Sequence, residues 1–111
     1  MSVEDVATVD MIGNDGSTGE VVLTISDHLS WEEAGHLLKL QDKLNAYLQF
    51  IESGQLLAQY PKARDRRARI CVICRFQPTE DGRRFLDEAS RVIEQAGVGF
   101  RHEVFRTDGN G

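Results

Sequence analysis

The sequence is poor in several features that would place it in a particular class of protein. It has two cysteines, two prolines and one tryptophan among 111 residues. No apolar run approaches the roughly 18 residues that a membrane-spanning helix needs. The N-terminal segment Met-Ser-Val-Glu-Asp lacks the basic and apolar regions of a secretion signal. These absences predict a cytoplasmic protein that does not associate with a membrane.

Lysine and arginine are absent from the first 30 positions, which hold six acidic residues. Residues 62–84, in contrast, carry eight basic groups against three acidic ones, a net charge of +5, which leaves −10 for the rest of a chain whose net charge is −5. An acidic chain is a poor candidate for nucleic-acid binding. The asymmetry fits a protein partner or a homodimer in which the basic edge of one copy meets the acidic hairpin of another. It also fits an immunity or antitoxin-like protein that neutralises a basic partner.

The two cysteines, Cys71 and Cys74, form a C-x-x-C motif in the middle of a predicted strand. A spacing of three along a strand sends the two thiols to opposite faces, so they cannot pair or bind one metal ion together. We therefore expect buried structural thiols. His36 is expected on the polar side of a helix and His102 in a strand, and neither has the spacing of a metal ligand. The sequence predicts no metal, no cofactor and no catalytic residues.

Two strand-like segments open the chain. Thr8–Ile12 and Gly19–Ser26 flank a cluster of turn-forming residues at 13–18, and this arrangement predicts an antiparallel hairpin.

A capped amphipathic helix follows. Ser30 and Glu33 have the spacing of a capping box, which predicts a helix that begins at Trp31. Gly54 supplies a left-handed residue at the end of this helix. Phe50 lies away from the apolar stripe and is expected to be buried against the sheet or to anchor a partner. The stripe itself consists of Leu37, Leu40, Leu44, Leu48 and Ile51.

The second half of the chain repeats the pattern of strand and helix. Gln55–Ala58 favours one further helical turn, and Ala68–Phe76 alternates as a strand does. Thr79 is the expected cap of a second long helix that ends at Gly97. Val98–Arg106 is the last predicted strand.

These elements predict an α+β fold with the order ββαβαβ. Strand, helix and strand joined by short links indicate right-handed crossovers between parallel strands. If the crossovers advance in one direction, both helices pack on one face of a four-stranded mixed sheet, which gives a two-layer sandwich. We expect a single domain over residues 1–111, with frayed ends at 1–6 and 107–111.

The sheet face without helices is the predicted interaction surface. Its mixture of apolar and arginine side chains is typical of a protein interface. The alternative is that these are the scattered apolar groups found on most protein surfaces. The residues predicted to form the interface are Arg69, Ile73, Arg75, Arg101 and Phe105.

Asp27 and His28 form a second candidate site. They follow a strand at the end where α/β-type folds often place functional groups. One interpretation is a small enzyme or ligand-binding protein in which His28 acts as a general base. The other is that both side chains bond backbone amides around the turn into the helix.

Several segments resemble a known family. They are Val9–Gly13, Thr18–Leu29 with Trp31, Leu40–Gly54 and Tyr60–Pro61. The sequence resembles a small bacterial family of about this length that is catalogued as a domain of unknown function. The resemblance implies a bacterial origin and a standalone cytoplasmic domain, and it brings no catalytic residues. The open face, and not the resemblance, favours a non-enzymatic protein-binding module, with self-association as one form of binding.

Overall fold

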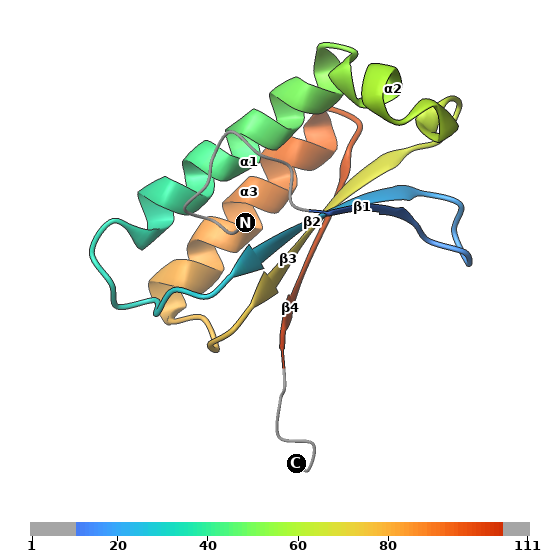
Figure 1. Cartoon of the computed structure of the whole chain (residues 1–111). Helices are drawn as coiled ribbons and strands as arrows, with labels where there is room; N and C mark the ends of the chain where they lie inside the picture. The colour runs from blue at the N-terminus through green and yellow to red at the C-terminus, as the bar shows by residue number, and fades with distance from the viewer. Residues whose placement is uncertain (1–10, 106–111) are drawn as a thin grey trace.

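The computed structural model describes residues 11–105 and shows one sheet covered by helices on one face (Figure 1). The ends expected to be frayed, at 1–6 and 107–111, lie outside the described residues, as do positions 8–10 of the first predicted strand. The elements are β1 (Met11–Asn14), β2 (Val21–Asp27), α1 (His36–Glu52), α2 (Gln55–Gln59), the one-turn 3-10 helix η1 (Pro61–Ala63), β3 (Ala68–Cys74), α3 (Glu80–Gln95) and β4 (Gly99–Val104).

The strands lie in the order β1-β2-β3-β4. β1 is antiparallel to β2, whereas β2, β3 and β4 are parallel to one another. Since both crossovers advance in the same direction, α1 and α3 cover the same face (Figure 1). This confirms the predicted α+β fold and its element order. The turn predicted at Gln55–Ala58 is α2, and Gly54, at φ 92°, ends α1 as predicted.

The core lies between the sheet and the two long helices. Alternate residues of β2 and β3 point toward the helices and are fully or almost fully buried, which is the pattern of a strand with one face on the core. Burial of one such Leu, Ile or Val side chain stabilises the fold by about 1.5–3 kcal/mol. The strand residues in the core are Val21, Leu23, Ile25, Ala68, Ile70, Val72 and Cys74.

The start of α1 differs from the prediction. The helix begins at His36 and not at Trp31. The Ser30 hydroxyl accepts a hydrogen bond from the Glu32 amide at 3.2 Å, so it closes a local turn. Gly35 then adopts φ 82°, a left-handed conformation that a helix interior does not contain. Residues 31–35 form a loop because Trp31 turns into the core.

The buried face of α1 is also displaced from the predicted stripe. Leu37, Leu48 and Ile51 are only half-buried at its margin. The prediction that His36 lies on the polar side was wrong, because its ring is in the core. Phe50 is buried, which agrees with the first of its two predicted roles, burial against the sheet. The residues that α1 buries are His36, Leu40, Lys43, Leu44, Tyr47 and Phe50.

The connection from β3 to α3 is short and capped. The Thr79 hydroxyl accepts a hydrogen bond from the Gly82 amide at 3.1 Å, which confirms the predicted cap. β3 ends at Cys74 and not at Phe76, the predicted end of the strand, and the Phe76 side chain is 47% exposed. The Trp31 indole N–H donates to the Phe76 carbonyl at 2.9 Å, and the indole lies in the core near this connection.

Candidate functional site

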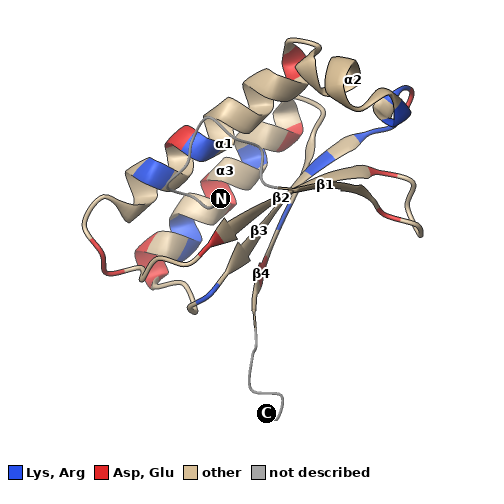
Figure 2. Ribbon diagram, viewed as in Figure 1, with Lys and Arg blue, Asp and Glu red and all other residues tan. Residues whose placement is uncertain are grey.

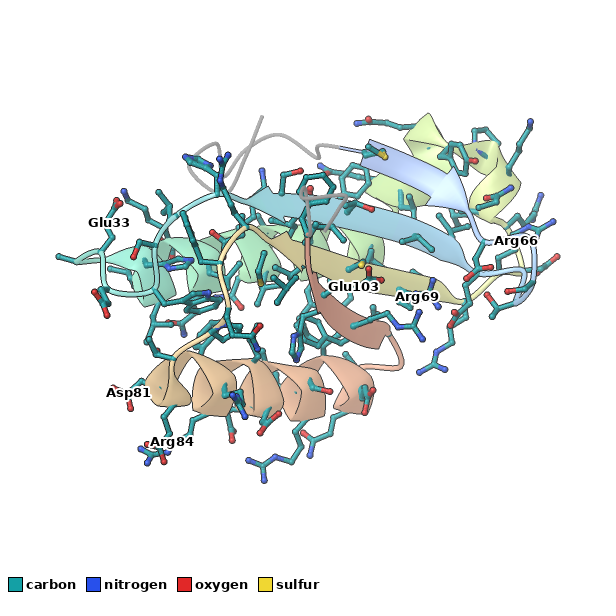
Figure 3. All side chains as sticks on the ribbon, turned by 90° about the horizontal axis from the view of Figure 1, so that it is seen from below. Glu33, Arg66, Arg69, Asp81, Arg84 and Glu103 are labelled. Carbon is teal, nitrogen blue, oxygen red and sulfur yellow. The ribbon has the colours of Figure 1, made fainter. Side chains whose placement is uncertain are left out.

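The predicted interface residues lie together on the open face of the sheet, which is the face without helices. Strand pairing places Arg69 beside Gly99 and Ile73 beside Glu103, and Arg101 beside Cys71, all on the face away from the helices. In Figure 3, Glu103 lies over the sheet near β3 and β4, and Arg69 lies toward its hairpin end.

Arg75 and Phe105 extend this face beyond the strands. The Arg75 amide donates to the Asp27 carbonyl at 2.9 Å, and the Phe105 amide donates to the Cys74 carbonyl at 2.7 Å. The ladder therefore continues one residue past β3 and β4, and alternation keeps both side chains on the open face.

An open hollow of about 610 Å³ lies on this face at the carboxyl ends of β2, β3 and β4. Met11 and Phe105, from the two outer strands, are 60% and 58% exposed beside it. Arg75, Arg101 and Glu103 form no ion pair with any residue in the range 11–105. The hollow is lined by Met11, Thr24, Ser26, Asp27, His28, Ile73, Arg75, Glu103, Val104 and Phe105.

Arg69 is bound within its own chain. Its Nη1 contacts Glu20 Oε1 at 2.8 Å and its Nη2 contacts Asp15 Oδ2 at 2.9 Å. The Arg69 side chain is only 14% exposed. Of the five predicted interface residues, Arg69 is thus the one already held in ion pairs, and neither Arg69 nor Arg101 lines the hollow. Arg69 clamps the β1–β2 hairpin onto β3.

The charge asymmetry of the sequence is partly neutralised by the same contacts. Figure 2 shows the acidic hairpin and the basic segment before β3 at one end of the sheet. Arg66 Nη1 also donates to the Gly19 carbonyl at 2.8 Å, at the hairpin end of the sheet in Figure 3. Asp15 and Glu20 of the hairpin are thus already paired within the chain, and a hairpin that neutralises a basic partner or a basic edge of another copy stays a prediction.

The hairpin clamp predicts a measurable pH dependence. Hydrogen bonds from the Ser17 hydroxyl and amide, and then from Arg69, hold the pKa of Asp15 well below its usual range. A carboxyl whose pKa is lowered by folding stabilises the fold above its ordinary pKa, and this stabilisation is lost as the pH falls. Asp15→Asn is therefore expected to flatten the loss of unfolding free energy between about pH 4 and pH 2.

Urea unfolding at a series of pH values measures this effect. Asp87→Asn is the matched control, because it removes an exposed carboxylate from α3. The same acid profile for Asp15→Asn and for the unaltered protein would show that the hydrogen-bonded Asp15 carboxylate does not stabilise the fold.

A buried pair lies beneath the carboxyl end of β2. His36 Nε2 contacts Asp27 Oδ2 at 2.6 Å, and both side chains are almost fully buried. His36 Nδ1 contacts the Ser30 carbonyl at 3.0 Å. Both ring nitrogens are therefore bonded inside the fold, Nδ1 to a carbonyl acceptor and Nε2 to the Asp27 carboxyl group. Asp27 Oδ1 accepts the Leu29 amide at 3.2 Å.

This pair was not predicted from the sequence. Asp27 was predicted to act with His28, whereas the structure places Asp27 with His36 in the core and leaves His28 exposed at the open-face hollow. Two signals point to the real pair. Asp27 continues the buried alternation of β2, and His36 lies four residues before the buried Leu40. Because both Asp27 oxygens are bound inside the fold, its carboxylate is a structural group.

The two cysteines lie on opposite faces of β3, as predicted, and both are free thiols in buried positions. Burial raises the pKa of the Cys74 thiol to about 12 and also raises that of Cys71. A thiol that resists ionisation is a weak nucleophile. Over residues 11–105, no group of three His, Cys, Asp or Glu side chains has an arrangement for a metal ion. None of the helices within that range is long and apolar enough to cross a membrane.

Comparison with curated proteins and with solved structures gives no match. A family model, described as a family of unknown function (DUF6572), matches residues 1–106. The match covers almost the whole chain and agrees with the resemblance found in the sequence. The chain belongs to the DUF6572 family, whose function is unknown.

Proposed function

We propose that this chain is a non-enzymatic protein-binding module of the bacterial cytoplasm that acts through the open-face hollow. The observation that carries the proposal is the position of Met11 and Phe105. These two large apolar side chains come from opposite edges of the sheet, are more than half exposed, and border one hollow with Ile73 between them. Contiguous exposed apolar surface with a polar rim is typical of a protein interaction site.

The polar residues of the hollow support a protein partner. Arg75 and Glu103 lie at its border with opposite charges and without ion pairs in the described chain. Interfaces combine an apolar centre with a charged rim, and arginine is enriched in them. A catalytic site would instead require convergent polar groups within hydrogen-bond reach of one another. The buried Asp27–His36 pair is held inside the fold, so it does not provide such a group.

The proposal is tested by affinity capture from a lysate of the source organism, with mass spectrometry of the bound proteins. Met11→Asp places a charge in the apolar centre and is expected to remove the specific partner, because an unpaired carboxylate would be buried at the interface. Ile73→Asp is the second variant. Leu38→Asp is the matched control, because Leu38 is 62% exposed on α1, in the helical layer, and receives the same chemical change.

A partner that is retained by Leu38→Asp and lost with both open-face variants supports the proposal, provided that all variants unfold at similar urea concentrations. A partner that is retained by Met11→Asp and Ile73→Asp, or the absence of any specific partner, contradicts it.

A further inference from the structure

β4 is an edge strand whose outer backbone groups have no partner in the described part of the chain. β4 pairs with β3 on one side only. The Phe105 amide points toward β3, where it donates to the Cys74 carbonyl. Because backbone groups alternate along a strand, those of Arg101 and Glu103 also point toward β3. The amides and carbonyls of Phe100, His102 and Val104 therefore point outward, and an exposed row of this kind is a template for another strand.

The side chains of β4 are complementary to a second copy of the same strand. Antiparallel pairing about a two-fold axis at His102 places Arg101 opposite Glu103 of the second copy, and Glu103 opposite Arg101 of the second copy. Both residues are exposed on the open face, and neither forms an ion pair within residues 11–105. The same register places Phe100 opposite Val104 on the helix face, and both are only half-buried in the single chain.

The backbone selects the same register. With the axis at His102, the outward groups of Phe100, His102 and Val104 form the hydrogen-bonded pairs, roughly six hydrogen bonds in all. Arg101 and Glu103 then occupy the non-hydrogen-bonded pairs, where facing side chains lie closest. An axis at Arg101 or at Glu103 would instead place like charges opposite each other.

Gly99 of one copy and Phe105 of the other are also complementary. In this register the Phe105 ring of one copy faces Gly99 of the other, on the open face. Gly99 has no side chain, and a Cβ there would lie 3.2 Å from Cγ of Arg69. An aromatic ring across from a strand glycine covers the exposed backbone, as in engineered sheets.

We infer that β4 is a homodimerisation edge, through which two copies form a continuous eight-stranded sheet by antiparallel pairing about His102. Because the two-fold axis is perpendicular to the sheet, both helical layers lie on one side and both open-face hollows lie on the other. This inference concerns the edge of the sheet and does not depend on the proposed binding through the hollow.

Sedimentation velocity of the full chain between about 5 and 500 μM tests the inference, since an edge contact of modest area is expected to associate in this range. The unaltered protein is expected to form a dimer. Arg101→Glu and Glu103→Arg each place like charges opposite each other at two symmetric positions, and each is expected to weaken association at least tenfold. The double variant Arg101→Glu with Glu103→Arg restores both opposite-charge pairs and is expected to restore the dimer.

Arg75→Glu is the control for the open face, because Arg75 lines the hollow and is not in β4. It is expected to leave the dimer unchanged. Circular dichroism of each variant separates dissociation from unfolding. A monomer at all concentrations overturns the inference. So does a dimer that is unaffected by Arg101→Glu, or a folded double variant that stays monomeric. Dissociation by Arg75→Glu alone would assign the contact to the open face instead.

Discussion

Replacement of His36 by alanine is expected to lower the free energy of unfolding by about 3–5 kcal/mol, because it leaves the Asp27 carboxylate buried without its partner. The two groups are 2.6 Å apart and almost fully buried. The imidazole also lies 4.3 Å, centroid to centroid, from the Trp31 ring, so its loss removes packing as well as charge. Urea unfolding at pH 7, followed by circular dichroism, measures the change.

Two controls distinguish the ion pair from simple loss of volume. His28→Ala changes the neighbouring exposed histidine and is expected to cost less than about 1 kcal/mol. Asp27→Asn is made alone and together with His36→Ala, and the double variant removes both partners of the buried pair. We expect the two single effects to be non-additive by about 1–3 kcal/mol. Additive effects, or a His36→Ala variant as stable as His28→Ala, would show that the pair does not hold the loop to the core.

Gly82→Ala is expected to destabilise the protein, although alanine is the better helix former. On an exposed helix this change would stabilise by about 1 kcal/mol. A Cβ at Gly82 would lie 2.5 Å from Cε3 of the Trp31 indole, a distance that real Cβ contacts do not show. The indole cannot easily retreat, since its N–H is bonded to the Phe76 carbonyl. Overpacking of this kind costs about 1–3 kcal/mol, so the sign of the helix effect is reversed.

The same change in a Trp31→Leu background tests the cause. With the indole removed, Gly82→Ala is expected to be neutral or stabilising, whereas the single variant is destabilised. Gly13→Ala is a useful control, because a Cβ at Gly13 meets nothing within 4 Å. Thermal unfolding of the five proteins, the unaltered chain included, gives the comparison. A stabilised Gly82→Ala single variant would mean that the Trp31 side chain moves freely.

The periodic elements of the fold could be predicted because their signals are local. Alternation in β3 and the Thr79 cap of α3 depend on neighbouring residues, and both are present in the structure. The start of α1 could not be predicted in the same way. Ser30 and Glu33 match a capping box, but the burial of Trp31 and the left-handed Gly35 determine the chain path there. Both depend on contacts with the rest of the fold.

For a similar reason, sequence patterns could not predict which residues pair with the charged side chains. Arg69 was predicted to face a partner, yet it binds Asp15 and Glu20, which are 54 and 49 residues away in the chain. A pattern shows that a side chain lies on a face, and it does not show which opposite charge the fold brings beside it. The open face itself was predictable, because its apolar and charged residues follow strand alternation.

The two proposed contacts lie on one sheet and share Glu103 and Phe105, which line the hollow and also lie at the β4 edge. Pairing through β4 would place two hollows on the same side of an extended sheet. Met11 and Ile73 belong to the hollow, whereas Arg101 is on the pairing edge. A partner with two equivalent binding segments would then gain avidity from the dimer. The two sets of variants separate the contributions.

The central claim is that partners bind on the open face, and hydroxyl-radical footprinting of the captured complex tests it most directly. Side-chain oxidation is measured by mass spectrometry for the chain alone and for the complex. Binding to the open face predicts protection of Met11, which is exposed in the single chain and lies at the edge of the sheet opposite β4, with no change at Leu38 and Val92 on the helices. Protection of Leu38 and Val92 with unchanged oxidation of Met11 would contradict the claim.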